Sequence, residues 1–229
     1  MTADAEKGPS EADEPEAPAP GELLTEATWA YRVGRLCCRL ELGLLHRLQV
    51  EGREHVPAEG GFLVVCNHQS FLDIPIVAAA LSRRHVSFVA RETLANFAPL
   101  AWLMRRCGAV LIRRGVADRR ALNEMIEHLR AGDVVCVFPE GTRSPDGRLG
   151  TFLPGALFAA RRARVPILPA GIRGACDAMP RDAKLPRPRR VGIRFGEPID
   201  GQRKDAMDVA RERIAGMIGN GKFGNIPGS

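Results

Sequence analysis

After Gly52 the sequence alternates short runs of β-branched and aromatic residues with longer segments of helical periodicity, and this alternation limits the fold most strongly. It is typical of an α/β domain, in which helices cover the faces of a sheet. The expected strands are Phe62–Cys66, Val86–Ala90, Ala109–Ile112, Val134–Phe138, Ile167–Ile172 and Val191–Phe195. The expected helices are Ile74–Leu81, Leu94–Arg105, Ala117–Arg130, Gly155–Arg164 and Ala206–Ile218. We therefore predict a single α/β domain over residues 51–219.

The two ends of the chain differ from this domain in composition. Residues 1–22 are rich in Pro, Ala and Glu and carry a net charge of −6, against +6 for the whole chain, which leaves +12 for the rest. We expect residues 1–22 to be a disordered acidic tail and residues 220–229 to be a flexible C-terminal tail. A body this basic favours partners that carry phosphate, such as nucleic acid, anionic lipid head groups or an acidic substrate.

Residues 23–50 form an N-terminal amphipathic segment, which we predict to be helical from about Leu23 to Leu48. Its apolar residues recur at helical spacing, at Trp29, Val33, Leu36, Cys37, Leu40, Leu44 and Leu48. Arginines occupy much of the remaining surface, at Arg32, Arg35, Arg39 and Arg47. A basic amphipathic helix can lie in a membrane interface. An apolar stripe more often packs on its own domain, and we favour packing for this one. No apolar run approaches the roughly 20 residues that a membrane-spanning helix needs.

The stretch from Asn67 to Asp73 follows the predicted strand Phe62–Cys66 directly and contains a base and a carboxylate. The five-residue spacing from His68 to Asp73 matches neither the period of a strand nor that of a helix, so the two side chains meet only if the chain turns between them. Asp73 would then orient the imidazole and leave its other nitrogen as a base. The alternative is a simple helix cap, because Ser70-x-x-Asp73 also has the pattern of a capping box.

A second turn follows the apolar run Val134–Phe138, which has the composition of a strand buried on both faces. Pro139 ends the strand, and Gly141 permits a positive φ, so that the following amides can converge on an anion. Thr142 and Arg143 would add donors to such a site. The alternative is an ordinary β-turn.

Arginines also follow other predicted strands. Arg114 comes after Ala109–Ile112, and Arg91 comes after Val86–Ala90. If these strands lie near Phe62–Cys66 and Val134–Phe138, both arginines would reach the edge that carries His68 and Arg143, since ligands of α/β sheets bind at the ends of strands.

The six cysteines are scattered, at Cys37, Cys38, Cys66, Cys107, Cys136 and Cys176. They form no Cys-x-x-Cys pair and have no histidine at metal-ligand spacing. We therefore expect reduced cysteines in a protein of the cytosolic side, and no metal site.

Four blocks of this sequence, taken in order, resemble those of the glycerolipid acyltransferases, most closely the bacterial 1-acyl-glycerol-3-phosphate acyltransferases. The resemblance extends from about Val50 to Phe195. The blocks are Asn67-His68-x4-Asp73, Leu111-Ile112-Arg113-Arg114, Phe138-Pro139-Glu140-Gly141-Thr142-Arg143-Ser144 and Val165-Pro166-Ile167-Leu168-Pro169.

This resemblance implies an α/β fold with a mixed, mostly parallel sheet, and transfer of a fatty acyl group from acyl-CoA or acyl carrier protein to the hydroxyl of a lysolipid. The product would be phosphatidic acid, an intermediate of phospholipid biosynthesis. The family would cast His68 as the general base and Asp73 as its partner. Its glycerol-phosphate site would comprise Glu140, Gly141, Thr142, Arg143 and Arg114. We add Arg91 to this site because it follows the predicted strand Val86–Ala90. Pro166 would belong to a structural or acyl-contacting turn. The thioester is a co-substrate, so no cofactor is expected, and the enzyme would lie at the cytoplasmic face of the membrane as a peripheral or monotopic protein.

Two positions depart from the family pattern. Arg113 stands where an acidic residue is often found, and Leu153 follows Phe152 where a lysine is common. These departures affect the expected head group of the acceptor more than the chemistry. An acyltransferase acting on another lysolipid or an aminolipid is therefore an alternative.

Two other functions remain as alternatives from different classes. A thioesterase-type hydrolase would use His68 to activate water, but water needs no arginine-lined phosphate site. A non-catalytic protein would bind nucleic acid or an anionic membrane through its basic body. With one Tyr and two Trp the chain lacks an aromatic platform for stacking bases, so we expect no nucleic-acid partner.

Overall fold

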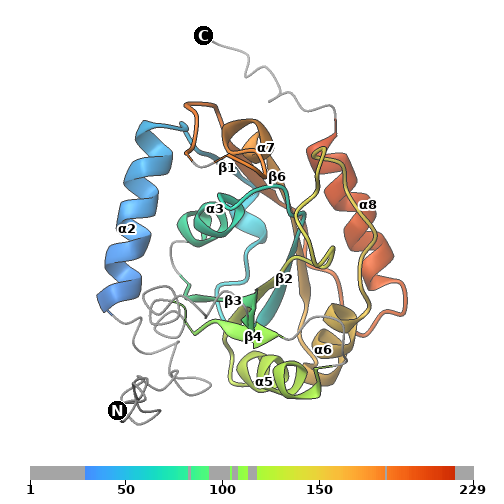
Figure 1. The fold of residues 1–229 in the computed structure, drawn as a ribbon. Helices are drawn as coiled ribbons and strands as arrows, with labels where there is room; N and C mark the ends of the chain where they lie inside the picture. The colour runs from blue at the N-terminus through green and yellow to red at the C-terminus, as the bar shows by residue number, and fades with distance from the viewer. Residues whose placement is uncertain are drawn as a thin grey trace, which may run out of the picture.

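The computed structural model describes residues 29–81, 84–92, 104, 108–112, 118–183 and 185–219 of the chain. Within these residues seven strands form one sheet in the order β1-β7-β6-β2-β5-β3-β4 (Figure 1). The strands are β1 (Gln49–Glu51), β2 (Phe62–Cys66), β3 (Val86–Arg91), β4 (Val110–Ile112), β5 (Val134–Val137), β6 (Ile167–Arg173) and β7 (Gly192–Phe195). Neighbouring strands are parallel except for β6 and β7. The mixed, mostly parallel sheet confirms the predicted fold class.

All six predicted strands are present, and no predicted boundary differs from the observed one by more than one residue. β1 was not predicted, because a run of three residues is too short to show a period. Strands β2, β3, β4, β5 and β6 all run in one direction and end at the same edge, which we call the carboxyl edge. Since β7 runs against β6 and β1 runs with β7, these two strands begin at the carboxyl edge.

Helices cover both faces of the sheet (Figure 1). The described helices are α2 (Trp29–Leu44), α3 (Asp73–Ala80), α5 (Arg119–Arg130), α6 (Gly155–Ala163), α7 (Ala175–Ala178), α8 (Ala206–Ile218) and the 3-10 turn η2 (Arg53–His55). The predicted helix Leu94–Arg105 lies outside the described residues except at Met104, which is helical.

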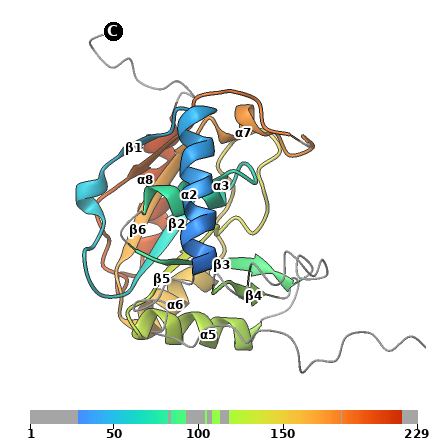
Figure 2. The same ribbon diagram turned by 90° about the vertical axis from the view of Figure 1, so that its left-hand side faces the viewer.

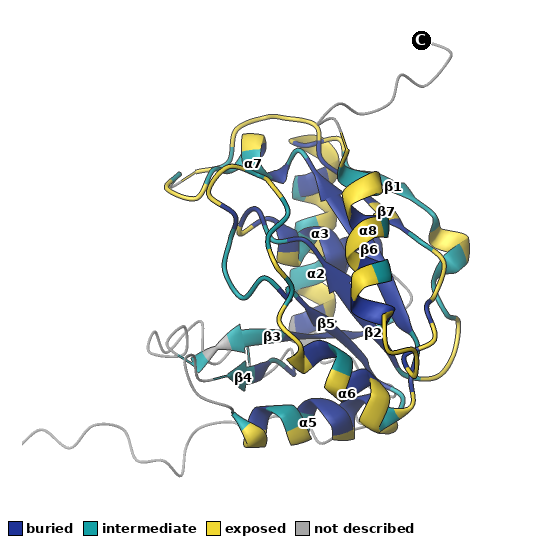
Figure 3. Cartoon of the chain, turned by 90° about the vertical axis from the view of Figure 1, so that its right-hand side faces the viewer, coloured by how far each residue is buried: buried dark blue, intermediate teal, exposed yellow. Residues whose placement is uncertain are grey.

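The side chains of β2 alternate between two buried clusters, as the period of a strand requires. Phe62, Val64 and Cys66 pack with α3 on one face. Leu63 and Val65 pack with α5, α6 and α8 on the other face. Figure 3 shows the central strands β2, β5 and β6 as buried and the outer surfaces of α5, α6 and α8 as exposed. A strand buried on both faces explains why Phe62–Cys66 is apolar throughout.

Helix α2 lies alongside α3 on the outside of the molecule (Figure 2). It contacts the body through the buried residues Tyr31 and Leu42. Four residues of the predicted apolar stripe face solvent instead, with exposed fractions of 51% for Val33, 55% for Leu36, 54% for Leu40 and 83% for Leu44, whereas Leu48 packs against the core. The favoured prediction that this stripe packs on the domain is therefore wrong for the four exposed residues. None of the described helices is long and apolar enough to span a membrane.

Candidate active site

Asn67 joins the ends of β2 and β6 at the carboxyl edge. Its side-chain Nδ2 donates to the carbonyl oxygen of Ile172 at 3.0 Å, and its Oδ1 accepts from the N–H of Ile172 at 2.7 Å. Asn67 is 1% exposed, so both hydrogen bonds are shielded from water. The turn that follows β2 is thus anchored to the neighbouring strand.

His68 and Asp73 meet across this turn, as is required if Asp73 is to orient the imidazole. His68 Nδ1 donates to Asp73 Oδ2 at 2.7 Å. The Asp73 side chain is fully buried, whereas the His68 side chain is 18% exposed. The imidazole stacks on the ring of Phe138 with a centroid separation of 4.3 Å and an interplanar angle of 20°. Since Nδ1 is bound to the carboxylate, Nε2 is the nitrogen left to accept a proton from a ligand at the surface.

Asp73 also organises the backbone of the turn. The same Oδ2 accepts from the N–H of Gln69 at 2.6 Å and from the N–H of Ser70 at 2.8 Å. Burial raises the pKa of the Asp73 carboxyl, and the hydrogen bonds from His68, Ser70 and Gln69 oppose that rise because they favour the ionised form. Asp73 therefore orients His68 and organises the turn before α3. The predicted capping box is only half formed: the Ser70 N–H donates to Asp73, but α3 begins at Asp73 itself and its N-cap, Leu72, makes no side-chain cap hydrogen bond.

Glu140 connects the His68 turn to the loop after β5. Its Oε1 accepts from the backbone N–H of His68 at 2.8 Å, and its Oε2 accepts from the N–H of Gly150 at 2.8 Å. Burial raises the pKa of the Glu140 carboxyl, and these two hydrogen bonds oppose the rise. The N–H of Ser144 adds a third link, donating to the carbonyl oxygen of His68 at 2.7 Å. Both carboxylate oxygens of Glu140 are thus engaged within the protein, which favours a positioning role; its contact with substrate stays a prediction.

The loop after β5 is a β-turn that also directs a guanidinium. The N–H of Gly141 donates to the carbonyl oxygen of Phe138 at 3.0 Å, and Gly141 has a φ of 65°. Thr142 follows, half-buried. Arg143 Nη1 donates to the carbonyl oxygen of Arg181 at 3.1 Å, and Arg143 Cζ lies 3.8 Å from the centroid of the Phe71 ring. The turn therefore brings a cation beside the His68 segment, as the sequence predicts.

The other two arginines predicted for the site are Arg91 and Arg114. Arg91 ends β3 at the carboxyl edge, but its side chain lies outside the described residues, as does the whole of Arg114. β4, which precedes Arg114, is not a direct neighbour of β2 or β5, because β3 lies between β4 and β5. At about 4.8 Å per strand, β4 lies roughly 14 Å from β2.

Pro166 lies at the opposite edge of the sheet from His68. It precedes β6, and its carbonyl oxygen accepts from the N–H of Leu63 near the start of β2 at 3.0 Å. Of the two predicted roles, this position favours a structural turn over contact with an acyl chain at the His68 site.

Several residues that hold the site together were not predicted. Ser70 Oγ donates to the carbonyl oxygen of Met179 at 2.7 Å, and Gln69 Nε2 donates to the carbonyl oxygen of Gly147 at 2.8 Å. These bonds tie the His68 turn to the loops that follow β6 and β5. No local pattern signals them, because their partners are distant in sequence. Phe71 is different, since a large aromatic residue inside a polar turn is itself a signal of a specific contact.

A second histidine–aspartate pair has the same spacing but a different environment. His128 Nδ1 lies 2.8 Å from Asp133 Oδ2, and the two side chains are 4% and 1% exposed. The pair joins the end of α5 to the start of β5, at the edge opposite His68. It is buried, so it supports the fold, whereas the His68 pair presents a ring edge to solvent.

The chain matches known proteins over most of this domain. Residues 47–173 match the family model described as Acyltransferase. A chloroplastic 1-acyl-sn-glycerol-3-phosphate acyltransferase of Arabidopsis thaliana is 30% identical over 190 residues, which cover 80% of this chain and 52% of the relative. A lyso-ornithine lipid O-acyltransferase of Pseudomonas aeruginosa is 31% identical over 168 residues, which cover 66% of this chain and 64% of the relative.

A solved structure has the same fold. It is the crystal structure of the 1-acyl-sn-glycerophosphate (LPA) acyltransferase PlsC from Thermotoga maritima, with a TM-score of 0.70 and 32% identity, covering 82% of this chain and 76% of that chain. The chain spans about half the length of the first curated relatives that it matches.

Proposed function

The chain belongs to the acyltransferase family, and on that basis we propose that it transfers a fatty acyl group from a thioester to the free hydroxyl of 1-acyl-glycerol-3-phosphate, giving phosphatidic acid. The observation that carries this proposal is the partly exposed His68 on a buried Asp73, beside an arginine-bearing turn at the carboxyl edge. The thioester is acyl-CoA or acyl carrier protein and serves as co-substrate, so the proposal needs no cofactor.

His68 acts as the base in this mechanism. The acceptor hydroxyl gives its proton to Nε2 while its oxygen bonds to the thioester carbonyl carbon, and the carbonyl electron pair moves to oxygen. When the tetrahedral adduct collapses, the C–S bond breaks and the thiolate takes the proton from the imidazolium. Asp73, bonded to Nδ1, stabilises that imidazolium. General-base catalysis typically contributes about a hundred- to ten-thousandfold, and positioning supplies much of the rest.

The acceptor phosphate would bind at the loop after β5. The guanidinium of Arg143 lies over Phe71, close to the His68 turn, and is suited to a bidentate contact with phosphate. Gly141 and Thr142 precede it in the same turn, and Arg91 and Arg114 remain proposed members of the site. A hydrolase would need no such cation, so Arg143 favours transfer to a phosphorylated acceptor over hydrolysis.

Leu153 is the reason to test a second kind of acceptor, a lysolipid with a different head group. Leu153, which replaces the lysine common in the family, is 58% exposed, and its N–H donates to the carbonyl oxygen of Pro139 in the predicted phosphate loop at 2.9 Å. The relative from Pseudomonas aeruginosa is named for a lyso-ornithine lipid. The second candidate function is therefore acyl transfer to a lysolipid with a head group other than glycerol phosphate.

We also propose that the protein works at the cytoplasmic face of a membrane, as a peripheral or monotopic enzyme. The exposed stripe of α2 supports this proposal, since apolar residues between arginines suit a lipid interface. The cysteines of the described residues are all free, as expected in a reducing compartment. Both the acceptor and the acyl product are lipids, so an enzyme held at the surface meets its substrate there.

The function is tested by a radiolabelled acyl-transfer assay with the purified protein. Acyl-CoA and acyl carrier protein donors are supplied separately, each with lysophosphatidic acid or with lyso-ornithine lipid as acceptor. Phosphatidic acid from the wild type, lost in His68→Ala, is the expected result. Transfer to lyso-ornithine lipid alone would replace the proposed acceptor with the second candidate. Free fatty acid formed at the same rate without any acceptor would show that the protein is a hydrolase.

A further inference from the structure

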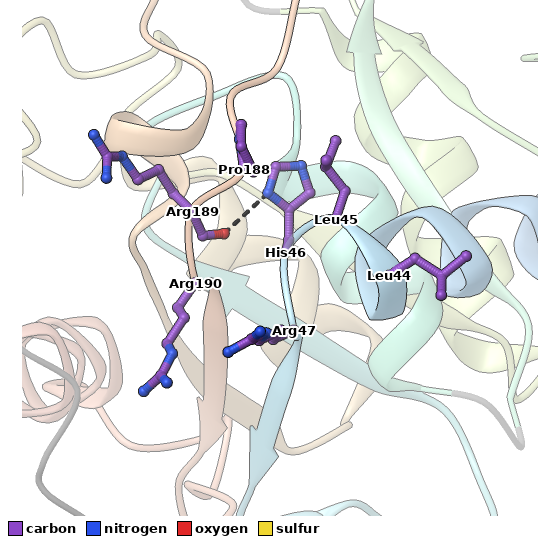
Figure 4. A pocket seen from close by; sticks show the side chains of 7 residues that line it. All are labelled: Leu44, Leu45, His46, Arg47, Pro188, Arg189 and Arg190. Atoms are coloured by element: carbon purple, nitrogen blue, oxygen red, sulfur yellow. Dashed lines mark hydrogen bonds between the residues drawn. The ribbon is translucent and has the colours of Figure 1, made fainter.

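A basic pocket opens at the carboxyl edge, where α2 ends and the loop before β7 passes it (Figure 4). Its volume is about 250 Å³. The rim combines cationic and apolar side chains, namely Leu44, Leu45, Arg47, Pro188, Arg189 and Arg190. Among the described residues no carboxylate and no residue of the His68 site lines it, although Glu41 Oε1 lies 3.0 Å from Nε2 of the lining residue His46.

The floor of this pocket is rigidly built around His46, which is fully buried. His46 Nδ1 donates to the carbonyl oxygen of Arg189 at 3.0 Å, as Figure 4 shows. The carbonyl oxygen of His46 accepts from the N–H of Val191 at 3.1 Å, and the N–H of Gln49 donates to the carbonyl oxygen of Val191 at 3.0 Å. These bonds join two segments that are distant in sequence, so the pocket is a feature of the folded domain and not of one loop.

Two arginines line this pocket from segments that are distant in sequence. Arg47 precedes β1, Arg190 precedes β7, and the two strands are parallel neighbours in the sheet. Figure 4 shows their side chains extending to the same side of the segments that lead into β1 and β7. Neighbouring like charges repel each other unless an anion lies between them. Within the described part of the chain neither arginine pairs with a carboxylate.

The backbone at Arg47 is also unusual. Its φ of 47° lies in the left-handed region, which non-glycine residues seldom occupy. This conformation directs the chain sharply from α2 into β1 and holds Arg47 at the pocket. Strained positions of this kind persist where the surrounding structure determines them, often at binding sites.

The pocket continues into the exposed apolar stripe of α2. Leu44, which is more exposed than Val33, Leu36 or Leu40, also lines the pocket. Arginine side chains beside an exposed apolar face match the layers of a lipid surface, in which phosphates lie just above the acyl chains. A soluble anion would use the arginines but would leave Val33, Leu36, Leu40 and Leu44 in water.

We propose that this pocket binds the phosphate of an anionic phospholipid head group while the exposed stripe of α2 enters the same lipid surface. The proposal rests on the proposed function in one respect, because the acceptor would lie in the same lipid surface. It adds a lipid-binding site separate from the acceptor site. Because the pocket and His68 share the carboxyl edge, one bound head group at the pocket would turn that edge toward the membrane.

Co-sedimentation of the full chain with lipid vesicles tests this proposal. One set of vesicles contains phosphatidylcholine alone, and the other contains about one third phosphatidylglycerol, which supplies the anionic head group. The test variant is Arg47→Ala with Arg190→Ala. The control is Arg119→Ala with Arg162→Ala, which removes the same charge from exposed positions on α5 and α6. With about 1 kcal/mol per basic residue at a lipid surface, the test variant should bind anionic vesicles roughly thirtyfold more weakly than wild type, and the control should bind much more tightly than the test variant.

The proposal is overturned if both double variants lose the same affinity, because binding would then depend on net charge alone. Equal binding of the wild type to both kinds of vesicle would overturn it as well. The single substitution Arg190→Ala, expected to weaken binding roughly fivefold, keeps the test valid if the double variant does not fold.

Transfer measured with detergent-dispersed acceptor separates this inference from the proposed function. The Arg47→Ala, Arg190→Ala variant should retain the wild-type turnover under these conditions. If the wild type transfers no acyl group but still prefers anionic vesicles, the proposed function fails and the lipid site stands.

Discussion

His85 makes the stability of this protein depend on pH, and the effect follows from its burial. The side chain packs on Tyr31 with a ring separation of 3.9 Å, and among the described residues neither ring nitrogen has a hydrogen-bond partner. Burial lowers the pKa of His85 from 6.5 to about 4. Asp133 opposes this shift, while the charges of Arg35 and His128 add to it.

The sign and size of the effect follow from this pKa difference. Above about pH 6.5 His85 is neutral in both the folded and the unfolded chain, so it adds no pH dependence. As the pH falls below that value the unfolded chain takes up a proton that the folded protein resists, so stability is lost until the pH reaches the folded pKa of about 4. A difference of about 2.5 units at 1.36 kcal/mol per unit gives a total loss of about 3 kcal/mol, of which about 2 kcal/mol is lost by pH 5.

Urea unfolding at about pH 7.5 and about pH 5 measures this loss in the wild type and in His85→Leu. Leucine fills a similar volume and cannot be protonated, so the free energy of unfolding should fall by about 2 kcal/mol less in the variant than in the wild type. The measurement at the higher pH is the control, because it isolates any change in packing. Parallel losses in the two proteins would refute the assignment of this pH dependence to His85.

Three further predictions concern the site. His68→Ala should lower kcat by about a hundred- to ten-thousandfold with little loss of stability, whereas His128→Ala, in the buried pair, should lower the unfolding midpoint and leave kcat unchanged. Kinetics and melting curves of both variants check this prediction, and an equal loss of activity in the two would contradict it. Glu140→Ala leaves two backbone N–H groups without their acceptor, so the free energy of unfolding should fall by about 1–3 kcal/mol and kcat should fall as well. If urea unfolding and kinetics show a change in KM alone, Glu140 contacts the substrate instead. Phe71→Leu removes the ring under Arg143 and with it a cation–π interaction of about 0.5–1 kcal/mol. The KM for the phosphorylated acceptor should therefore rise about two- to fivefold at constant kcat, and an unchanged KM would argue against phosphate binding by Arg143.

Much of the fold was predictable because the signals are local. The strand Phe62–Cys66 is apolar throughout and was placed correctly, since burial on both faces leaves a continuous apolar run. The His68 turn was predictable for a similar reason, because a base and a carboxylate five residues apart can meet only across a turn, and a strand end supplies one.

The N-terminal helix shows where local signals fail. Helical spacing identified the apolar stripe of α2, but periodicity does not say whether a stripe meets the core or the surroundings. The structure buries Tyr31 and Leu42 and exposes Leu36 and Leu40 instead. That choice depends on where α3 lies, and the position of α3 is set by the sheet.

The sequence by itself indicated six of the seven described strands, a turn across which His68 and Asp73 could meet, and an arginine-bearing turn after β5, because each depends on neighbouring residues. Only the tertiary structure decided that Glu140 supports the His68 backbone from 72 residues away, that Pro166 lies at the far edge, and that Arg47 and Arg190 line one pocket. These contacts join segments distant in the chain, and their geometry follows from strand order and register, which no short stretch of sequence specifies.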